Sequence, residues 1–340
     1  MLYIPFDHYT NSPIANFLWI LLFVQTQIIL CPVDLDIVIV TYNRLEKLKK
    51  ALLCYEQQTA SFRNLIVVDN CSTDGTKRYL DEWKQQKAPF QKVVIYSEEN
   101  LGGSGGFYLG QKKAMELGAD WVFVADDDAY ATPTMIADFI QFIENHDTSG
   151  IAAVCATVKK MDGGIAYVHR DRFKIAKGEN WLCKKFERYS TTDADYQKEY
   201  FDIDLLTYVG SFISGKALRK VGLVNHRYFI YEDDTEHSIR LRKYGKIIVV
   251  PQIQIVHEEH SSDGNSNGVN WRSYYDCRNK THMLLKHYPR TVIYTIYIEL
   301  RHLLGRKILN RPTNAYALLK YEAVMDALFG RLGKHSIYRP

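Results

Sequence analysis

Hydrophobic residues follow two alternating patterns over the first 145 residues of the chain. Runs of consecutive, mostly β-branched residues are typical of buried parallel strands. They occur at 36–41, 65–68, 92–96 and 122–125. Between them apolar residues recur every three or four positions, as at Leu45, Leu48 and Leu52, which predicts amphipathic helices. Strand and helix alternate four times, so the pattern predicts an α/β protein with a doubly wound, mostly parallel sheet.

Each predicted strand is followed by polar or small residues. These are Thr41, Asn43 and Arg44, then Asp69 and Asn70, then Asn100 with the glycine-rich run 102–106, and last Asp126, Asp127 and Asp128. The glycine run suits either a close approach of the backbone to a ligand or a flexible turn, and a helix is predicted from Phe107 to Leu117. Ligands of doubly wound sheets bind at the carboxyl ends of the strands. The four loops are therefore expected to build one site.

The three consecutive aspartates carry the most specific chemistry. Like charges within one turn repel each other, and a divalent cation with oxygen ligands, Mg²⁺ or Mn²⁺, relieves that repulsion. The alternative is a solvated acidic turn ahead of the next helix, because Thr132 and Pro133 suit an N-cap and a first helical position.

The second half of the chain is less regular. Residues 160–200 are polar and aromatic without a sustained period, which predicts an insertion or an acceptor-facing loop region. After a strand-like stretch from Leu206, a short helix at 216–221 and an aromatic strand end at 228–231, four acids cluster at the start of a basic helix. They are Glu232, Asp233, Asp234 and Glu236. A further strand, 246–250, leads to His257.

Positive charge is concentrated at the C-terminal end. The net charge of the 340 residues is only +4, but ten Lys or Arg stand against three acids from Lys286 to Pro340. Two amphipathic helices are predicted there, at 291–304 and 316–332. They suit a dock on the anionic inner face of the cell membrane, or a contact between copies of the chain. Nucleic acid is disfavoured, because no nucleic-acid motif occurs.

The N-terminal 33 residues form an apolar extension of uncertain role. The stretch 16–31 is interrupted by Gln25, Thr26 and Gln27, which is too polar for a membrane span. No Lys or Arg precedes Arg44, so a signal peptide lacks its positive region. The six cysteines are scattered, which favours reduced thiols in a cytoplasmic protein.

Motif order identifies a family resemblance. Gly-x-Gly-x-x-Gly after the first strand and Gly-Lys-Ser/Thr are both missing, which removes the main support for a dehydrogenase or a P-loop NTPase. The chain instead resembles the inverting nucleotide-sugar transferases of glycosyltransferase family 2 over about residues 34–285. The resemblance is carried in order by VDLDIVIVTYNR (33–44), which contains an insertion relative to the family motif, and then by VVDNCSTDGT, NLGGSGGF, DDDA, YEDDTEHSIRLRKYG and His257. NLGGSGGF, DDDA and WRSYYDCRN look most like the galactofuranosyltransferase and rhamnosyltransferase branch.

The resemblance implies a GT-A fold at 34–285, followed by a basic helical tail at 286–340, and it assigns roles to residues. Nucleotide-sugar contacts are Thr41, Asn43, Arg44, Asp69, Asn100, Gly102, Gly103, Asp126 and Asp127. Metal ligands are Asp126, Asp128 and His257; an imidazole beside carboxylates favours Mn²⁺, with Mg²⁺ as the alternative. Asp234 is the general base, with Asp233 and Glu236 able to share that role. Acceptor contacts are Trp271, Tyr274, Tyr275, Arg278 and Asn279.

The expected function is transfer of galactofuranose from UDP-galactofuranose to a lipid-linked or growing bacterial surface glycan, by an enzyme peripheral on the inner membrane face. A dTDP-rhamnose transferase is the alternative within the class. An inactive carbohydrate-binding or assembly protein on the same fold is the alternative outside it. A nucleotidyltransferase would favour a glycine-rich phosphate loop with a following Lys near the first strand, which is missing.

Overall fold

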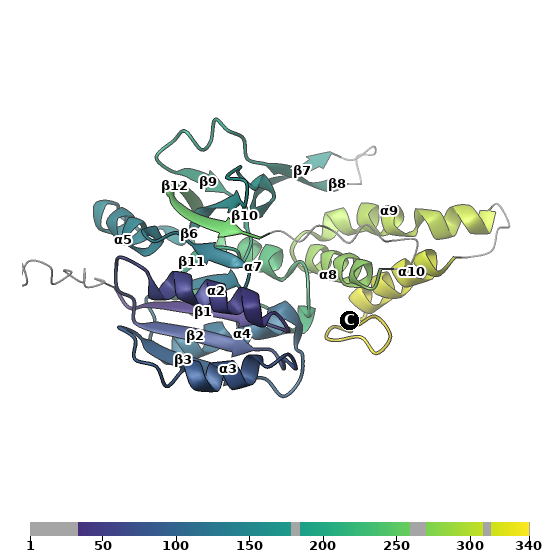
Figure 1. Ribbon diagram of the computed structural model, residues 1–340. Helices are drawn as coiled ribbons and strands as arrows, with labels where there is room; N and C mark the ends of the chain where they lie inside the picture. The colour runs from purple at the N-terminus through teal and green to yellow at the C-terminus, as the bar shows by residue number, and fades with distance from the viewer. Residues whose placement is uncertain (1–32, 178–183, 259–269, 309–313, 340) are drawn as a thin grey trace, which may run out of the picture.

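The computed structural model describes residues 33–177, 184–258, 270–308 and 314–339 (Figure 1). The predicted apolar extension, apart from Val33, lies outside these residues.

Within the described residues, nine strands form one mixed sheet that contains the predicted parallel half. The first four strands run parallel in the order β3-β2-β1-β4. Their bounds are Leu35–Thr41 (β1), Asn64–Asp69 (β2), Gln91–Tyr96 (β3) and Trp121–Asp126 (β4). The sheet continues through β11 (Ser211–Ser214), β6 (Ile151–Lys160), β12 (Lys246–His257) and β5 (Ala129–Ala131), with β9 (Phe201–Ile203) beside β12. Strand β11 is antiparallel to both neighbours, whereas β6 and β12 are parallel.

Helices cover both faces of the sheet, because β1 is apolar on both sides. Ile37 and Ile39 pack in one cluster with residues of α2 (Leu45–Glu56), α3 (Thr76–Trp83) and α5 (Met135–Asn145). Val38 and Val40 pack in the other with residues of α4 (Gly102–Glu116) and α6 (Gly215–Val221). The predicted α/β sheet with flanking helices is confirmed.

The glycine-rich run is helical rather than a turn. Helix α4 begins at Gly102, five residues before the predicted start at Phe107. A Cβ on Gly106 would lie 2.4 Å from Val40 Cγ1, and one on Gly110 would lie 2.2 Å from Val38 Cγ1. Glycine therefore lets α4 press directly against β1, a tertiary requirement that outweighs the low helix propensity of glycine.

Residues 160–200 also contain regular structure that the sequence pattern did not indicate. Strands β7 (Arg170–Lys177) and β8 (Lys184–Ser190) pair antiparallel, and β10 (Leu205–Leu206) joins them in a three-stranded sheet. Phe173 and Phe186 stack across the hairpin at 4.7 Å between ring centroids. Residues 228–231, predicted as a strand end, instead follow the short 3-10 helix η2 (His226–Tyr228) as a turn.

The C-terminal helices form a group beside the sheet (Figure 1). They are α8 (Arg272–His287), α9 (Pro289–Ile308) and α10 (Ala315–Leu328), and α8 runs through the predicted domain boundary at residue 285. Both helices predicted in the tail are confirmed. Among the described residues, no helix combines the length and apolar character needed to cross a membrane.

Candidate active site

A cleft opens at the carboxyl ends of β1 and β4. Its larger part has a volume of about 670 Å³ and is lined by Asp126, Asp128, Asp233, Asp234 and His257, among others. An adjoining part of about 280 Å³ is lined by residues of the predicted loops. They include Thr41, Arg44, Asn70, Asn100, Gly102, Gly103, Asp126 and Asp127. Arg44, Gly103 and Asp126 line both parts. The prediction that four loops build one site is confirmed.

Asp127 is fixed by the first loop. Its carboxylate accepts hydrogen bonds from Thr41 Oγ1 at 2.7 Å and from Arg44 Nη1 at 3.2 Å. Burial raises the pKa of Asp127 to about 6, against the opposing effects of Arg44 and Thr41.

Two predicted nucleotide contacts bind the backbone of the loop after β2 instead. Asn43 Oδ1 accepts a hydrogen bond from the Thr73 backbone N–H at 2.7 Å, and Asp69 Oδ1 accepts one from the Ser72 backbone N–H at 3.0 Å.

Cations of the chain itself relieve part of the repulsion among the aspartates. Arg44 Nη1 lies 3.0 Å and Lys47 Nζ 3.7 Å from Asp128 Oδ2. The negative charge around Asp126 is not fully compensated. Burial and the charges of Asp128 and Asp127 raise the pKa of Asp126 well above the usual range. The sequence interpretation that these acids need a divalent ion did not foresee these two basic side chains.

The predicted metal ligands Asp126, Asp128 and His257 line the cleft, but their donor atoms do not surround one position. His257 Nε2 lies 3.2 Å from Asp128 Oδ1. The other ring nitrogen, Nδ1, is buried and lacks a hydrogen-bond partner in the part of the chain that the structure describes. Imidazole and carboxylate groups are ligands that Mn²⁺ accepts, so the donor set fits a metal in kind. Among the described residues no three acidic, histidine or cysteine side chains converge as a metal cluster.

The predicted general base opens helix α7 (Asp233–Leu241). Asp234 Oδ1 accepts from the Thr235 backbone N–H at 2.6 Å. Burial and the charge of Glu232 raise the pKa of Asp234 to about 6, although Arg188 opposes this. Burial and the charge of Asp234 raise the pKa of Asp233 well above its usual range. Both carboxyls line the cleft and differ in their surroundings, which suits acid–base chemistry.

Glu236 does not share this role. Its side chain is fully buried on another side of α7. It contacts Arg240 Nε at 2.8 Å, His287 Nε2 at 2.9 Å and Lys286 Nζ at 3.2 Å. Burial alone would raise its pKa, but the bond to His287 and the two cations hold the pKa below the usual range. The prediction that Glu236 can act as the base is wrong, because it is committed to these ion pairs.

A strained turn precedes the base. Phe229, Tyr231 and Glu232 all adopt positive φ, at 68°, 66° and 62°. Such conformations cost about 1–3 kcal/mol each for non-glycine residues, and they cluster at functional sites. Gly102 makes room for this turn, because a Cβ there would lie 2.0 Å from the Phe229 carbonyl oxygen. Helix α4 and the base-bearing turn are therefore in direct contact.

Arg278 and Asn279 hold that turn from helix α8. Asn279 Nδ2 lies 2.9 Å from the carbonyl oxygens of Tyr228, Ile230 and Tyr231. Arg278 Nη2 donates to the Tyr228 oxygen at 3.1 Å. Both side chains are buried. Arg278 also donates to the Gly333 oxygen at 2.7 Å and to Asn279 Oδ1 at 2.9 Å. The prediction that they contact an acceptor is wrong, because their donors are directed to groups of the chain itself.

Tyr274 and Tyr275 are also buried rather than exposed to the cleft. They pack with Leu319, Ala323 and Val324 of α10. The prediction of acceptor contacts is wrong for these two as well, since aromatic residues at helical spacing here form a core. Trp271 does line the cleft as predicted. The sequence analysis missed other lining residues, namely His169, Arg188, Tyr208, Tyr231, Arg272 and Asp276.

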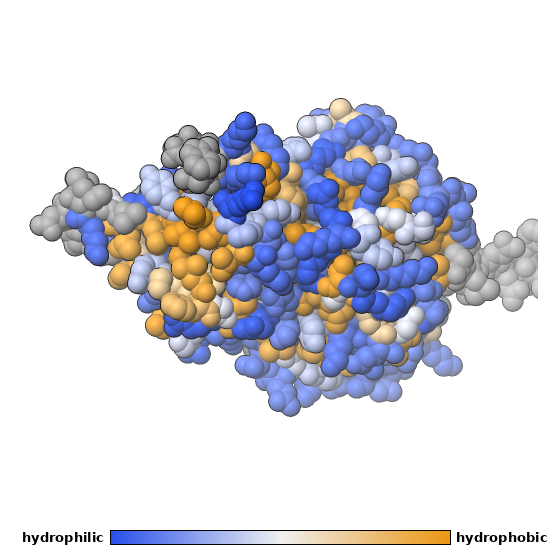
Figure 2. Space-filling model, turned by 180° about the vertical axis from the view of Figure 1, so that it is seen from behind, coloured by the Kyte–Doolittle hydropathy of each residue, from blue (hydrophilic) through white to orange (hydrophobic). Residues whose placement is uncertain are grey.

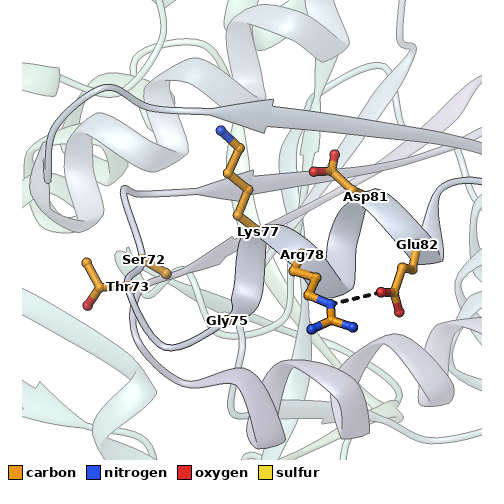
Figure 3. A pocket seen from close by; sticks show the side chains of 7 residues that line it. All are labelled: Ser72, Thr73, Gly75, Lys77, Arg78, Asp81 and Glu82. Carbon is orange, nitrogen blue, oxygen red and sulfur yellow. Dashed lines mark hydrogen bonds and ion pairs between the residues drawn. The ribbon is translucent and has the colours of Figure 1, made fainter.

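A separate hollow lies beside α3 (Figure 3). Its lining residues include Lys77, Arg78, Asp81 and Glu82. Arg78 Nε pairs with Glu82 at 3.2 Å, and both side chains are largely exposed. Such surface pairs contribute little. None of the aspartates of the cleft lines this hollow.

Comparison with known proteins assigns the family. The sequence model described as glycosyl transferase family 2 matches residues 36–218, more than half of the 340 residues. The chain belongs to this family.

Relatives and solved structures agree with that family. Galactofuranosyltransferase GlfT1 of Mycolicibacterium smegmatis is 31% identical over 214 residues, which are 61% of this chain and 65% of the relative. The match thus spans slightly less than two thirds of that relative's length. The dTDP-rhamnosyl transferase RfbF of Shigella flexneri is 25% identical over 263 residues, covering 74% of this chain and 80% of the relative.

The structural neighbours agree in fold. GalNAc-T7 with UDP, GalNAc and Mn²⁺ has a TM-score of 0.59 at 14% identity, covering 87% of this chain and 56% of the neighbour. Mannosyltransferase PcManGT from Pyrobaculum calidifontis, with GDP-Man and Mn²⁺, has a TM-score of 0.52 at 13% identity, covering 94% and 95%. The predicted GT-A type of fold is confirmed.

Proposed function

We propose that this protein is an inverting, metal-dependent glycosyltransferase that moves a sugar from a nucleotide donor to a hydroxyl acceptor. One observation carries the proposal. A single cleft joins the loops after the parallel strands, the aspartates of β4 and the Asp234 carboxyl, whose pKa is raised to about 6. A carboxyl with that pKa is ionised near neutral pH and remains basic enough to accept a proton.

Asp234 is the proposed general base. As the acceptor hydroxyl attacks the anomeric carbon, its proton passes to the Asp234 carboxylate, and the bond to the diphosphate breaks on the opposite face. Arg188 pairs with Glu232 and lies near Thr235, so it steadies the start of α7. Asp233 is the reserve candidate, because it lines the same cleft. No covalent intermediate on the protein is needed.

Asp126, Asp128 and His257 are the proposed metal ligands. A bound Mn²⁺ or Mg²⁺ would neutralise charge on the donor diphosphate. Support comes from the carboxylate–imidazole pair of Asp128 and His257 and from neighbours of the same fold solved with Mn²⁺. Thr41 and Arg44, which line the cleft, remain the proposed contacts of the nucleoside, and Asn43 and Asp69 are proposed to hold the loop 69–73 beside them.

Galactofuranose from UDP-galactofuranose is the proposed donor sugar, and the acceptor is a lipid-linked or growing bacterial surface glycan. The support is the similarity to galactofuranosyltransferases. dTDP-rhamnose is the second candidate, since a rhamnosyl transferase matches over more of the chain. Release of nucleoside diphosphate from each donor distinguishes the two. If the protein bound a nucleotide-sugar donor but did not turn it over with any acceptor, the result would support a carbohydrate-binding protein instead.

The C-terminal helices are the proposed contact with the inner membrane face. An apolar area lies on one side of the molecule (Figure 2). Large apolar side chains of α9 and of the α10 end are exposed, including Ile293 (65%), Tyr297 (57%) and Phe329 (66%). The ten basic residues against three acids from Lys286 to Pro340 complement anionic lipid. Trp271, which lines the cleft, packs against the cluster that contains Leu319, Ala323 and Val324 of α10, which suits a lipid-linked acceptor.

A further inference from the structure

His169 is a cleft residue to which neither the sequence motifs nor the proposed mechanism gives a role. It ends the short 3-10 helix η1 (Tyr167–His169) and lines the larger part of the cleft together with Asp126, Asp128 and His257. Its ring lies 5.0 Å from that of His257, centroid to centroid, with the two planes at 88°. It therefore lies beside the proposed metal ligands.

The hydrogen bonds around His169 suit one tautomer. Its Nδ1 lies 3.0 Å from Thr207 Oγ1. Arg170 Nη1 lies 3.4 Å from the same oxygen, and a guanidinium can only donate. We assign the hydrogen of the threonine hydroxyl to Nδ1, so that the hydroxyl accepts from Arg170 and donates to His169, and the proton of the neutral imidazole to Nε2.

That N–H group has no protein partner. His169 Nε2 is buried and makes no hydrogen bond to any residue that the structure describes. Buried donors without a partner are rare, and each needs an explanation. Because His169 lines the cleft, a ligand oxygen there can supply the missing partner.

Arg170 holds the backbone segment that carries His169 in place. Its guanidinium is fully buried and donates to the backbone oxygens of Ala156, His169, Val209 and Gly210 at 2.7–3.0 Å. The segment carrying His169 is thereby tied to β6 and to the loop before β11. A donor fixed in this way needs little reorganisation when a charge develops nearby.

We propose that the Nε2–H group of His169 donates a hydrogen bond to a non-bridging oxygen of the donor diphosphate. This inference rests on the proposed function, which assigns the diphosphate to the adjacent metal ligands. A diphosphate oxygen only accepts, which suits a group that only donates. During transfer the acceptor oxygen forms a bond to the anomeric carbon, and the bond from that carbon to the diphosphate oxygen breaks. The electron pair leaves with the nucleoside diphosphate, so negative charge grows there and the bond from His169 strengthens.

Nucleotide binding tests this without turnover. Titration calorimetry would compare UDP with uridine, and dTDP with thymidine, for the full chain with and without Mn²⁺. His169→Phe removes the donor while keeping a ring. We expect it to weaken binding of the diphosphate about tenfold and to leave nucleoside binding unchanged. His169→Gln restores an amide donor and should recover part of the loss. His146→Phe removes a histidine ring outside the cleft and should leave both values unchanged.

Kinetics supply a second readout. Loss of a donor whose bond strengthens as charge develops should lower kcat by about 10²-fold, a larger change than the increase in KM, which should not exceed the loss of UDP affinity of about tenfold. Thr207→Val keeps the imidazole but no longer fixes its tautomer, so we expect a smaller loss of UDP affinity of about threefold. This variant keeps the test open if His169→Phe does not fold.

The outcomes separate the inference from the proposed function. If the wild type prefers UDP to uridine and the variants keep that preference in full, the inference about His169 is overturned and the proposed function stands. If the wild type shows no preference for either diphosphate over its nucleoside, the proposed function itself fails. Weaker diphosphate binding in His169→Phe, with partial recovery in His169→Gln, supports the inference.

Discussion

The turn that carries the base depends on one buried amide, that of Asn279. Its Oδ1 accepts from Arg278 Nε at 2.9 Å, which directs the Nδ2 group to the turn. We consider Asn279→Leu, which keeps most of the volume and removes the donors. Arg278 still reaches the Tyr228 oxygen at 3.1 Å, so the oxygens of Ile230 and Tyr231 lose their donor.

The cost follows from those two carbonyl groups. A buried acceptor without a partner costs about 1–3 kcal/mol. Tyr231 is 43% exposed, and water can reach its backbone in part. Arg278 Nε adds to this cost, because it loses its acceptor, Asn279 Oδ1. With the lower half of the range for each of the three groups, we expect a loss of about 3–6 kcal/mol in the free energy of unfolding. A fold whose stability lies above about 6 kcal/mol, within the typical range of about 5–15 kcal/mol, survives this loss.

The catalytic rate of the protein that remains folded should also fall. Three residues of the turn, Phe229, Tyr231 and Glu232, adopt positive φ, so the turn relaxes once Asn279 no longer holds it. Asp233 and Asp234 follow directly in the chain. A displacement of about 1 Å at a reacting group can cost about 10²-fold in rate. We expect kcat to fall by about that factor.

The assay combines thermal unfolding with nucleoside diphosphate release. Thr281→Val is the matched control on the same helix, because Thr281 Oγ1 is buried and lacks a hydrogen-bond partner among the described residues. Its removal should cost neither stability nor activity. Wild-type turnover in a folded Asn279→Leu protein would refute the reasoning that α8 positions the base.

Three other perturbations have direct outcomes. A base must be unprotonated, so with the pKa of Asp234 raised to about 6, kcat should rise about tenfold per pH unit below 6 and level off above it; a flat profile would contradict this. Gly102→Ala places a Cβ 2.0 Å from the Phe229 oxygen at φ +71° and should abolish turnover, whereas Gly150→Ala, with no atom within 4 Å, should not. Phe329→Glu should weaken co-sedimentation with anionic vesicles without changing turnover of a water-soluble acceptor; unchanged sedimentation would contradict the membrane contact.

The sequence predicted the parallel half of the fold because each strand there is a continuous apolar run. Polar residues at the ends of those strands could be assigned to one site, because the carboxyl ends of parallel strands lie at the same edge of the sheet. The helical state of residues 102–106 was not predicted, since it depends on tertiary contact, such as that of Gly106 with Val40, rather than on local propensity. Only the folded chain reveals that contact.

The acceptor side was predicted least well. Aromatic residues at helical spacing can face a core or a cleft, and the sequence does not say which side the next helices cover. Helix α10 covers Tyr274 and Tyr275, whereas Trp271 remains at the cleft. His169 escaped notice because its partners, Thr207 and His257, lie far away in sequence.

The most direct test of the central claim is nucleoside diphosphate release by the purified protein with Mn²⁺, for wild type and Asp234→Asn. The donors are UDP-galactofuranose, UDP-galactopyranose, UDP-glucose and dTDP-rhamnose, with a lipid-linked disaccharide acceptor. Asp147→Asn, which changes an exposed loop carboxylate, is the control. We predict that one donor, UDP-galactofuranose, is turned over by wild type and control, and that turnover falls at least about 10²-fold in Asp234→Asn with donor binding retained. Equal turnover by Asp234→Asn would contradict its role as base, and absence of donor binding by the wild type with metal would contradict the transferase itself.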